Sequence, residues 1–183
     1  MNGSHVATKR RRRKFCADFA RDGDGATAVE FALVAAPFLA LLIALLQTFV
    51  VFFAQQLLES VVRQSSRLVM TGQVKEQAMT QDAFKQKVCD QVVIFFTCSG
   101  LMVDLQVANS WSTADTSMPP LSFDATGAVK NTWKFEPGDI GDIVVLRVTY
   151  VWPVVLGPLG FNLSNLSSGN RQIMASAAFQ NEP

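Results

Sequence analysis

A long apolar segment lies near the N-terminus of the chain. Residues 31–46 are apolar without exception, and after Gln47 and Thr48 the apolar pattern resumes as far as Ala54. The 24 residues from 31 to 54 carry no charge, whereas a membrane-spanning helix needs about 20 apolar residues. A core helix of a soluble domain is usually shorter and has a polar stripe. The pattern therefore predicts a transmembrane helix, with a buried core helix as the alternative.

The helical pattern continues beyond the apolar segment, but only on one face. The apolar-face positions are Leu57, Leu58, Val61, Val62, Ser65, Leu68 and Val69, and the charged positions opposite them are Glu59, Arg63 and Arg67. These spacings of three and four residues are typical of an amphipathic helix. Thr71 and Gly72 predict its end, because glycine readily adopts the left-handed conformation that terminates helices. We therefore expect one helix over residues 26–70.

The remaining residues predict a small α+β domain. Thr80 is a suitable N-cap for a second, short helix. The apolar face expected for this helix consists of Phe84, Val88, Gln91/Val92 and Phe95. Alternation with a period of two predicts four strands, at residues 102–110, 128–137, 143–152 and 171–180. In the third of these strands, Arg147 and Thr149 are expected on the solvated face. Four antiparallel strands packed on the long helix would give a small α+β domain.

Two long connections join the predicted strands. Residues 109–127 are rich in turn-forming residues and contain Trp111, which we expect to be exposed. Residues 153–170 are apolar at first and then polar. This second connection either covers the sheet or forms a contact surface for a partner, and the sequence leaves both alternatives open.

Charge is unevenly distributed along the chain. Residues 1–25 contain seven Lys or Arg and three Asp, a balance of +4, which leaves nine basic and twelve acidic residues, or −3, in residues 26–183. Six of the basic residues are consecutive: Lys9, Arg10, Arg11, Arg12, Arg13 and Lys14. A basic cluster before a membrane span keeps that side in the cytoplasm, so we expect a cytoplasmic N-terminus and an exported C-terminal domain. A nucleic-acid or nuclear-targeting patch is the competing interpretation, but the body of the chain predicts no nucleic-acid partner.

One acidic residue, Glu30, lies at the N-terminal edge of the apolar segment. In one interpretation, Thr27–Glu30 forms a helix-capping box, and the acid also meets the positive end of the helix dipole. However, an ionised carboxylate at membrane depth costs on the order of a few kcal/mol unless it has a partner. In the second interpretation the chain is cut between Gly25 and Ala26, which creates an α-amino group one helical turn from the carboxylate. Glycine at the cut would let a protease approach the backbone closely.

The residues around this site resemble the prepilin-peptidase site of type IV pilins and pseudopilins. The resemblance is carried by Gly25, Ala26, Glu30 and Phe31. More narrowly, "GATAVEFALVAAPFLALLIALLQ", with its early proline Pro37, is similar to the opening of TadE-like proteins. These are minor pilins of the bacterial tight-adherence (Tad, Flp) pilus machinery. The end of the chain, "AAFQNEP", is also similar to that family, although the resemblance is specific only over about residues 22–70.

The resemblance implies a domain organisation and a function. Residues 1–25 would be a cytoplasmic leader removed by prepilin peptidase, and residues 26–54 a transmembrane helix in the bacterial inner membrane. Residues 55–72 would continue that helix outside the cytoplasm, and residues 73–183 would form a periplasmic domain. The implied function is structural, in assembly of the pilus, with prepilin peptidase, other minor pilins, the major pilin and inner-membrane lipid as partners. The alternative is an uncleaved single-span protein with an extracytoplasmic binding or sensing domain.

Cysteine usage agrees with an exported domain. Cys16 lies in the leader, so that Cys89 and Cys98 remain as an even pair in an oxidising compartment. In one continuous helix their Cα atoms would be about 13.5 Å apart, which is too far for a disulfide. A disulfide between them therefore requires the second helix to end or bend before Thr97. Two unpaired buried thiols are the alternative.

The sequence offers little for catalysis or metal binding. Its single histidine is His5, in the leader, so the exported domain lacks the commonest general base. No phosphate-binding glycine loop is present, and the two remaining cysteines cannot complete a zinc site. We therefore expect no enzymatic activity, no metal and no cofactor.

Overall fold

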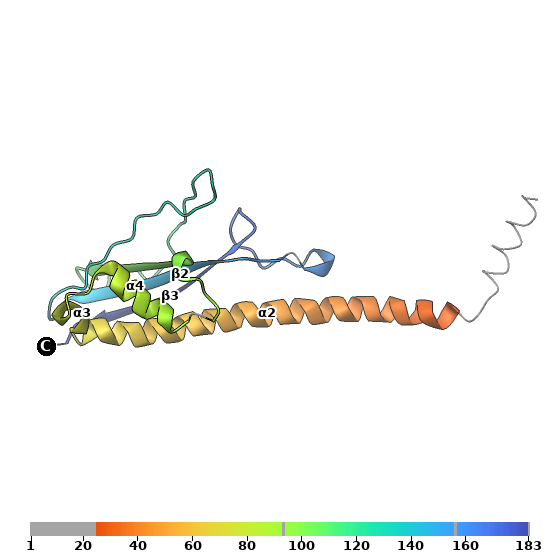
Figure 1. Ribbon diagram of the computed structural model, residues 1–183, viewed down its shortest axis with the longest axis horizontal. Helices are drawn as coiled ribbons and strands as arrows, with labels where there is room; N and C mark the ends of the chain where they lie inside the picture. The colour runs from red at the N-terminus through yellow and green to blue at the C-terminus, as the bar shows by residue number, and fades with distance from the viewer. Residues whose placement is uncertain (1–24, 93, 156, 183) are drawn as a thin grey trace, which may run out of the picture. The chain divides into compact units, whose positions relative to one another are not determined.

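The computed structural model describes residues 25–92, 94–155 and 157–182, and these fall into two units divided between Leu45 and Leu46. The elements (Figure 1) are α2 (Ala26–Met70), α3 (Gln73–Glu76), α4 (Gln81–Asp90), η2 (Cys98–Gly100), β1 (Leu101–Ala108), β2 (Ile143–Trp152), η3 (Pro158–Gly160) and β3 (Arg171–Gln180). The predicted α+β class is confirmed.

Helix α2 has the length expected from the sequence. It runs without interruption through Pro37, and within the described residues it is the helix that is long and apolar enough to cross a membrane. The side chains of its most apolar window are not buried by the protein. In a soluble protein such a surface would be a large exposed apolar patch, so the membrane-span interpretation is favoured over a core helix.

The C-terminal part of α2 packs into the domain through one stripe of small and aliphatic side chains. The buried positions are Val51, Ala54, Leu58, Val61, Val62, Ser65 and Val69. Gly72, with a φ of 74°, follows the helix, and its N–H donates to the carbonyl of Val69 at 2.9 Å, which confirms the predicted stop. The short helix α3 after it was not expected from the sequence.

Helix α4 begins as predicted and ends earlier. The Thr80 hydroxyl accepts a hydrogen bond from the Ala83 N–H at 3.2 Å, so the N-cap is confirmed. The helix ends at Asp90, however, and Phe95 lies beyond it, 38 % exposed. Phe96 is buried instead and packs edge-on against Tyr150.

The sheet is antiparallel, with the order β1-β2-β3. In the centre of the register, Leu146 of β2 pairs with Leu105 of β1 and Ala177 of β3. Strands β2 and β3 have ten residues each and are therefore about 33 Å long. One face of the sheet packs on the helices. The fully buried side chains of the core between them include Leu58 of α2, Phe84 of α4, and Leu101, Leu105, Leu146 and Ile173 of the sheet.

The strand predicted at residues 128–137 is not formed, which corrects the expectation of four strands to three in the described chain. This segment meets β1 only at a parallel bridge between Leu105 and Phe135. Further along it, the Lys130 N–H donates to the carbonyl of Ser122 at 2.9 Å. Its backbone donors are thus shared between β1 and a local turn, so no continuous ladder develops.

The second face of the sheet is not solvated, contrary to the expectation for Arg147 and Thr149. Thr149 is 1 % exposed, and the Arg147 side chain is 11 % exposed. The long connection after β1 covers this face: the carbonyl of Pro119 accepts a hydrogen bond from Gln172, and that of Thr116 accepts one from Ser176. A polar pattern in one strand cannot reveal that a distant loop will shield it.

A buried ion pair anchors this covering connection. Oδ2 of Asp104 accepts hydrogen bonds from Arg147 Nη2 at 2.7 Å and Nε at 3.1 Å. Oδ1 accepts from the backbone N–H of Lys134 at 2.9 Å, and the carboxylate also binds the Gln106 amide. Arg147 in turn reaches Asp115 of the connection at 3.3 Å. A carboxylate with this many donors joins two strands and the connection in one network.

The outer carboxylate of the network has a shifted pKa. Hydrogen bonds from Ser117 hold the pKa of Asp115 below its ordinary value, and the Arg147 guanidinium makes a smaller contribution in the same direction. Because the pKa of Asp115 is lower in the folded state, its ionisation stabilises the folded state at pH values above the ordinary pKa of an aspartate. This stabilisation is lost as the pH falls through the lowered pKa.

Removing the central carboxylate should destabilise the domain. We expect Asp104→Ala to lower the free energy of unfolding by about 3–5 kcal/mol, because the buried Arg147 then keeps only the exposed Asp115 as a counter-charge. Urea unfolding of the full chain in detergent micelles measures the change, with the exposed Glu76→Ala as a matched control within about 0.5 kcal/mol of the wild type. The double variant Asp104→Leu/Arg147→Met should regain much of the loss. Equal stability of Asp104→Ala and Glu76→Ala would show that the network is not needed.

Candidate functional site

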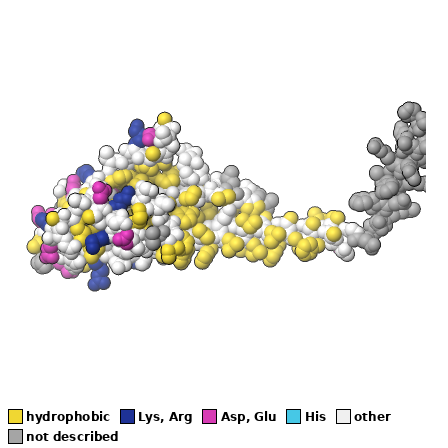
Figure 2. Space-filling view, viewed as in Figure 1, with side chains coloured by type: hydrophobic (Ala, Val, Ile, Leu, Met, Phe, Trp, Pro, Cys, Tyr) yellow, Lys and Arg dark blue, Asp and Glu magenta, His cyan; other side chains and the backbone are white. Residues whose placement is uncertain are grey.

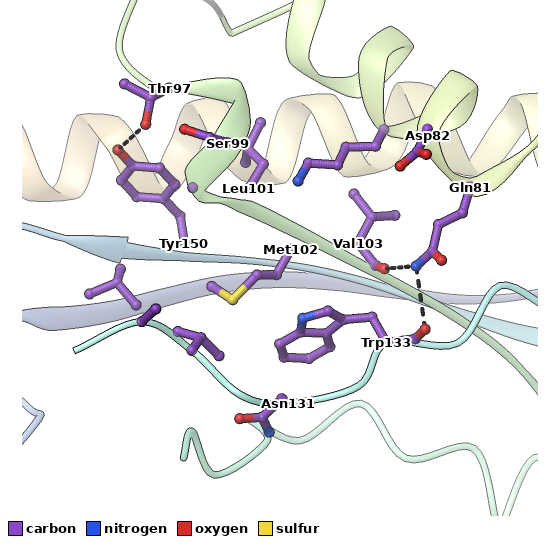
Figure 3. Close-up of a pocket in the computed structure, with 15 residues that line it drawn as sticks. Gln81, Asp82, Thr97, Ser99, Leu101, Met102, Val103, Asn131, Trp133 and Tyr150 are labelled. Atoms are coloured by element: carbon purple, nitrogen blue, oxygen red, sulfur yellow. Dashed lines mark hydrogen bonds between the residues drawn. The ribbon is translucent and has the colours of Figure 1, made fainter. Parts of the chain in front are cut away.

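An open groove of about 610 Å³ lies between α4 and the edge strand β1 (Figure 3). The Gln81 amide bridges its floor by donating to the carbonyl of Val103 at 3.3 Å and that of Trp133 at 3.4 Å. At the other end, the hydroxyls of Thr97 and Tyr150 are 3.2 Å apart. Amide and hydroxyl groups of this kind can bind a polar molecule but supply no general base of the histidine type.

Sequence reasoning did not identify this groove. Its lining comes from α4, the start of β1, the end of β2 and residues 128–133, and no one of these segments carries a recognisable motif. Within the described residues, no group of three or more His, Cys, Asp and Glu side chains is placed to hold a metal ion. The groove is lined by amide and hydroxyl groups together with the charged side chains of Asp82 and Lys85.

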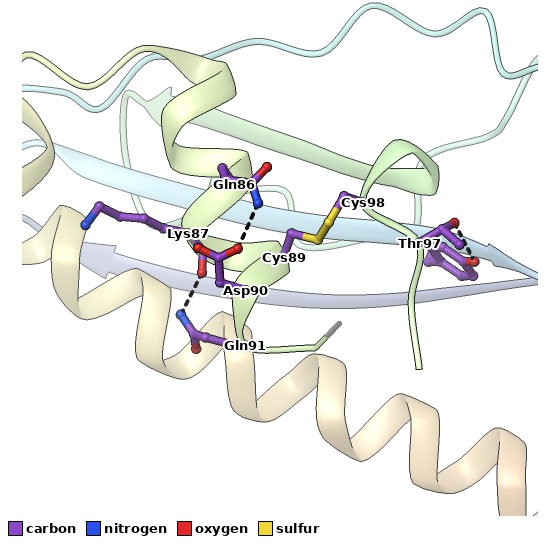
Figure 4. The surroundings of a disulfide bond; sticks show 8 residues. Gln86, Lys87, Cys89, Asp90, Gln91, Thr97 and Cys98 are labelled. Atoms are coloured by element: carbon purple, nitrogen blue, oxygen red, sulfur yellow. Dashed lines mark hydrogen bonds between the residues drawn. A yellow bond between two sulfur atoms is a disulfide. The ribbon is translucent and has the colours of Figure 1, made fainter. Parts of the chain in front are cut away.

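The disulfide predicted between Cys89 and Cys98 is confirmed (Figure 4). Their Cα atoms are 5.4 Å apart, because α4 ends at Asp90 and the chain turns back toward η2. The Val92 N–H donates to the carbonyl of Cys89 at 2.8 Å within this turn. The bridge thus holds the end of α4 against the start of the sheet, and the alternative of two free thiols is wrong.

The N-terminus of α2 carries the residues of the predicted processing site. Gly25 immediately precedes the helix, and the side chains from Ala26 to Phe31 are exposed. Glu30 lies four residues after Ala26, so that both are on the same face one turn apart, with a rise of about 6 Å between them. Helical side chains point toward the N-terminus, and the Glu30 carboxylate is therefore directed to the Ala26 end.

The protein's own fold does not require glycine at position 25. A Cβ added to Gly25 would meet nothing within 4 Å, and its φ is not in the left-handed region. Elsewhere glycine is needed: a Cβ at Gly100 would lie 2.7 Å from Tyr150 Cε2. The absence of any internal constraint leaves room for an external one at Gly25, such as the active site of a protease.

The capping-box interpretation of Glu30 is not supported. Helix α2 begins at Ala26, which places Thr27 inside the helix and leaves no acidic residue in the first turn. Among the described residues, no hydrogen bond or ion pair is formed by the Glu30 side chain. Within residues 25–92, 94–155 and 157–182, the carboxylate at the edge of the apolar segment therefore has no partner.

Comparison with known families matches this same segment. Residues 25–67 match the family model TadE: TadE-like protein. The match begins at Gly25 and extends along α2 almost to its end, so it includes Glu30 and Pro37. No curated protein and no solved structure matches the chain. The match supports a protein related to the Tad pilus in general, and the recognition of TadE-like features is confirmed over these residues.

Two features predicted from the sequence lie outside the segment that matches the TadE-like model. The basic residues 9–14 and Cys16 lie outside the described residues, and outside the matched segment as well. The domain after residue 67 is also unmatched, so the groove and the disulfide are known only from the structure of this chain. The segment that this chain has in common with the TadE-like family model is therefore residues 25–67, which include most of α2.

Loss of the disulfide should weaken the domain measurably. We expect Cys89→Ala/Cys98→Ala to lower the free energy of unfolding by about 2–3 kcal/mol, because the bridge restricts the unfolded chain over a short loop. Urea unfolding with and without dithiothreitol measures the effect. Reductant should lower the stability of the wild type and leave the double variant unchanged. If dithiothreitol reaches the disulfide in the unfolded chain and the stability of the wild type still does not change, the stabilising role of the disulfide is contradicted.

Proposed function

We propose that the chain is a TadE-like minor pilin or pseudopilin, a membrane-anchored structural component needed for assembly of a Tad (Flp) pilus. The observation that carries this proposal is the TadE-like match, which starts at Gly25 and covers the apolar helix with Glu30 near its start. A family of this kind is structural, which is the basis for proposing no enzymatic activity and no cofactor. The expected partners are prepilin peptidase, other Tad minor pilins, the major pilin and inner-membrane lipid.

The first step in this function is proteolytic processing. Prepilin peptidase hydrolyses the peptide bond between Gly25 and Ala26, with water supplying the hydroxyl to Gly25 and a proton to the new amine of Ala26. Residues 1–25 leave as the basic leader. The exposed backbone at Gly25, with free space where a Cβ would be, supports access for a protease at this bond.

Processing supplies the missing partner of Glu30. The new α-ammonium of Ala26 lies one turn from the carboxylate, in the same chain or on a neighbouring subunit. An ionised carboxylate at membrane depth costs on the order of a few kcal/mol when unpaired, and an ammonium beside it offsets much of this cost. A pair formed between subunits sets their relative register, which is how a single charge in an apolar helix can guide assembly.

Topology follows from the distribution of charge and cysteine. The basic residues 9–14 would hold the N-terminus in the cytoplasm, and the domain would then lie in the periplasm. The disulfide between Cys89 and Cys98 is the kind of bond that forms in that oxidising compartment. Both features support an inner-membrane protein with one span and an exported domain.

The N-terminal sequence of the mature protein tests the processing step. Mass spectrometry of protein isolated from membranes of the native host should give a chain that begins at Ala26. In a strain without prepilin peptidase the same protein should retain residues 1–25. An intact leader in a strain with an active peptidase contradicts the proposal.

Substitutions at Glu30 separate processing from assembly. We expect Glu30→Ala and the isosteric Glu30→Gln to be cut normally but to abolish pilus assembly, because neither variant can pair with the ammonium. Electron microscopy and immunoblots of sheared pili from the native host measure assembly. The matched control is Glu76→Ala, at an exposed acid in α3, which should assemble as the wild type does. Normal pili from Glu30→Gln would show that the charge has no role.

The groove beside β1 favours a second candidate function. In that case the chain is an uncleaved single-span protein whose extracytoplasmic domain binds or senses a ligand in the groove of about 610 Å³. Retention of the leader together with unaffected pili in a Glu30→Ala strain would favour this function over the first.

A further inference from the structure

Three separate segments of the domain carry no charged residue. Residues 46–58, 91–103 and 148–170 contain no Asp, Glu, Lys, Arg or His. After Glu30, every charged residue of the chain lies in the stretches between or beyond them. Long charge-free stretches are unusual on the surface of a soluble domain, where charged residues are normally exposed.

The structure brings these three segments together at one end of the domain. The rings of Phe53 and Phe95 pack edge to face at 5.2 Å, and those of Phe96 and Trp152 at 5.8 Å. The Gln47 amide donates to the carbonyl of Val155 at 3.3 Å. The second and third segments therefore pack beside the first, which is part of α2.

This end of the domain exposes a set of large apolar side chains, which we call the apolar collar. The collar consists of Phe49, Phe52, Phe53, Ile94, Phe95 and Val155. Ile94 is 89 % exposed and Val155 74 %. Figure 2 shows hydrophobic side chains gathered along α2 where it leaves the sheet, with Lys, Arg, Asp and Glu gathered toward the other end of the domain. An exposed patch of this kind marks an interaction surface.

Helix length sets the level of the collar relative to the membrane. A hydrocarbon core about 30 Å thick takes about 20 helical residues. Counted from Phe31, the first residue after the charge of Glu30, a span of that length reaches Val50. Yet Val51 and Ala54 are already buried by the domain. The first positions buried by the domain therefore follow directly, along the sequence, on the end of a span of that length.

We propose that the apolar collar rests in the headgroup and acyl boundary of the same bilayer that α2 crosses, so that the domain is docked on lipid and not suspended above it. This inference rests on the membrane-anchored arrangement of the proposed function, but it does not depend on processing or on pilus assembly. Trp152, beside the collar, is at the position where aromatic residues with a polar edge favour the interface.

Lipid fits the collar better than a second protein chain. Protein interfaces surround their apolar centre with a polar rim and contain about one hydrogen bond per 100–200 Å², whereas the three segments have no charge with which to form ion pairs at such a rim. The second and third segments contain irregular backbone. Such backbone would be unfavourable deep in hydrocarbon and is compatible with the hydrated interface. The disulfide between Cys89 and Cys98 constrains the segment that carries Ile94 and Phe95.

Single-tryptophan variants of the full chain test the docking. Trp111→Phe/Trp133→Phe keeps Trp152, at the collar end of β2, and Trp133→Phe/Trp152→Phe keeps Trp111, which follows the opposite end of the sheet. Each is reconstituted in vesicles of phosphatidylethanolamine and phosphatidylglycerol whose acyl chains are brominated near the headgroup. Resistance to carbonate extraction establishes insertion. We expect bromine to quench Trp152 strongly and to leave Trp111 nearly unchanged.

Charges placed in the collar provide the second arm. In the Trp152 background, Ile94→Asp/Val155→Asp should reduce quenching while leaving urea unfolding unchanged, because both side chains are exposed. Equal quenching of Trp152 and Trp111 in inserted protein overturns the docking. So does weak quenching of Trp152 accompanied by cross-linking of two collars, which would assign the surface to a second copy. Protein that fails to insert overturns the docking together with the membrane span.

Discussion

The continuity of α2 is the constraint on which the other features of this protein depend. One helix is apolar on every side over residues 31–46 and buries a single stripe from Val51 onward. The residues of the stripe pack the helix into the core of the domain, whereas the apolar segment before them is not buried by the protein.

The small size of the domain explains its other stabilising features. Three strands place one face on the helices, but the chain has no further helix or sheet within its described part to cover the other face. A long connection covers it instead, and a connection brings backbone groups that need partners. Asp104 accepts from the Lys134 N–H, and the Gln172 and Ser176 side chains donate to the carbonyls of Pro119 and Thr116. At the junction of α4 and β1, the disulfide between Cys89 and Cys98 links the two elements covalently.

The two proposals concern the two ends of the apolar segment. At its N-terminal end, an exposed carboxylate and a glycine lie where the TadE-like match begins. At its C-terminal end, the collar combines residues of α2 with Ile94, Phe95 and Val155 of the two other charge-free segments. In the proposed function both ends meet the membrane boundary, one on each side. The domain beyond them contributes the groove and the charged surface through which partners could be distinguished.

Some features could be predicted because they depend on neighbouring residues alone. The extent of α2, its stop at Gly72, the Thr80 cap and the start of α4 are local. The disulfide also followed from composition, since only two cysteines remain outside the leader. Periodicity and end signals act within a few residues, so the sequence by itself was sufficient.

Features that join distant segments could not be obtained in this way. The alternation in β2 suggested a solvated face for Arg147, but burial depends on a connection some 30 residues away that happens to carry Asp115. The alternation near Phe135 predicted a strand, yet this segment pairs with β1 only at the bridge between Leu105 and Phe135. Further along it, the Lys130 N–H donates to the carbonyl of Ser122 instead. The sequence by itself determined the long apolar helix and the local elements. Only the tertiary structure decided which faces are covered, because burial is a property of chain segments that meet in space.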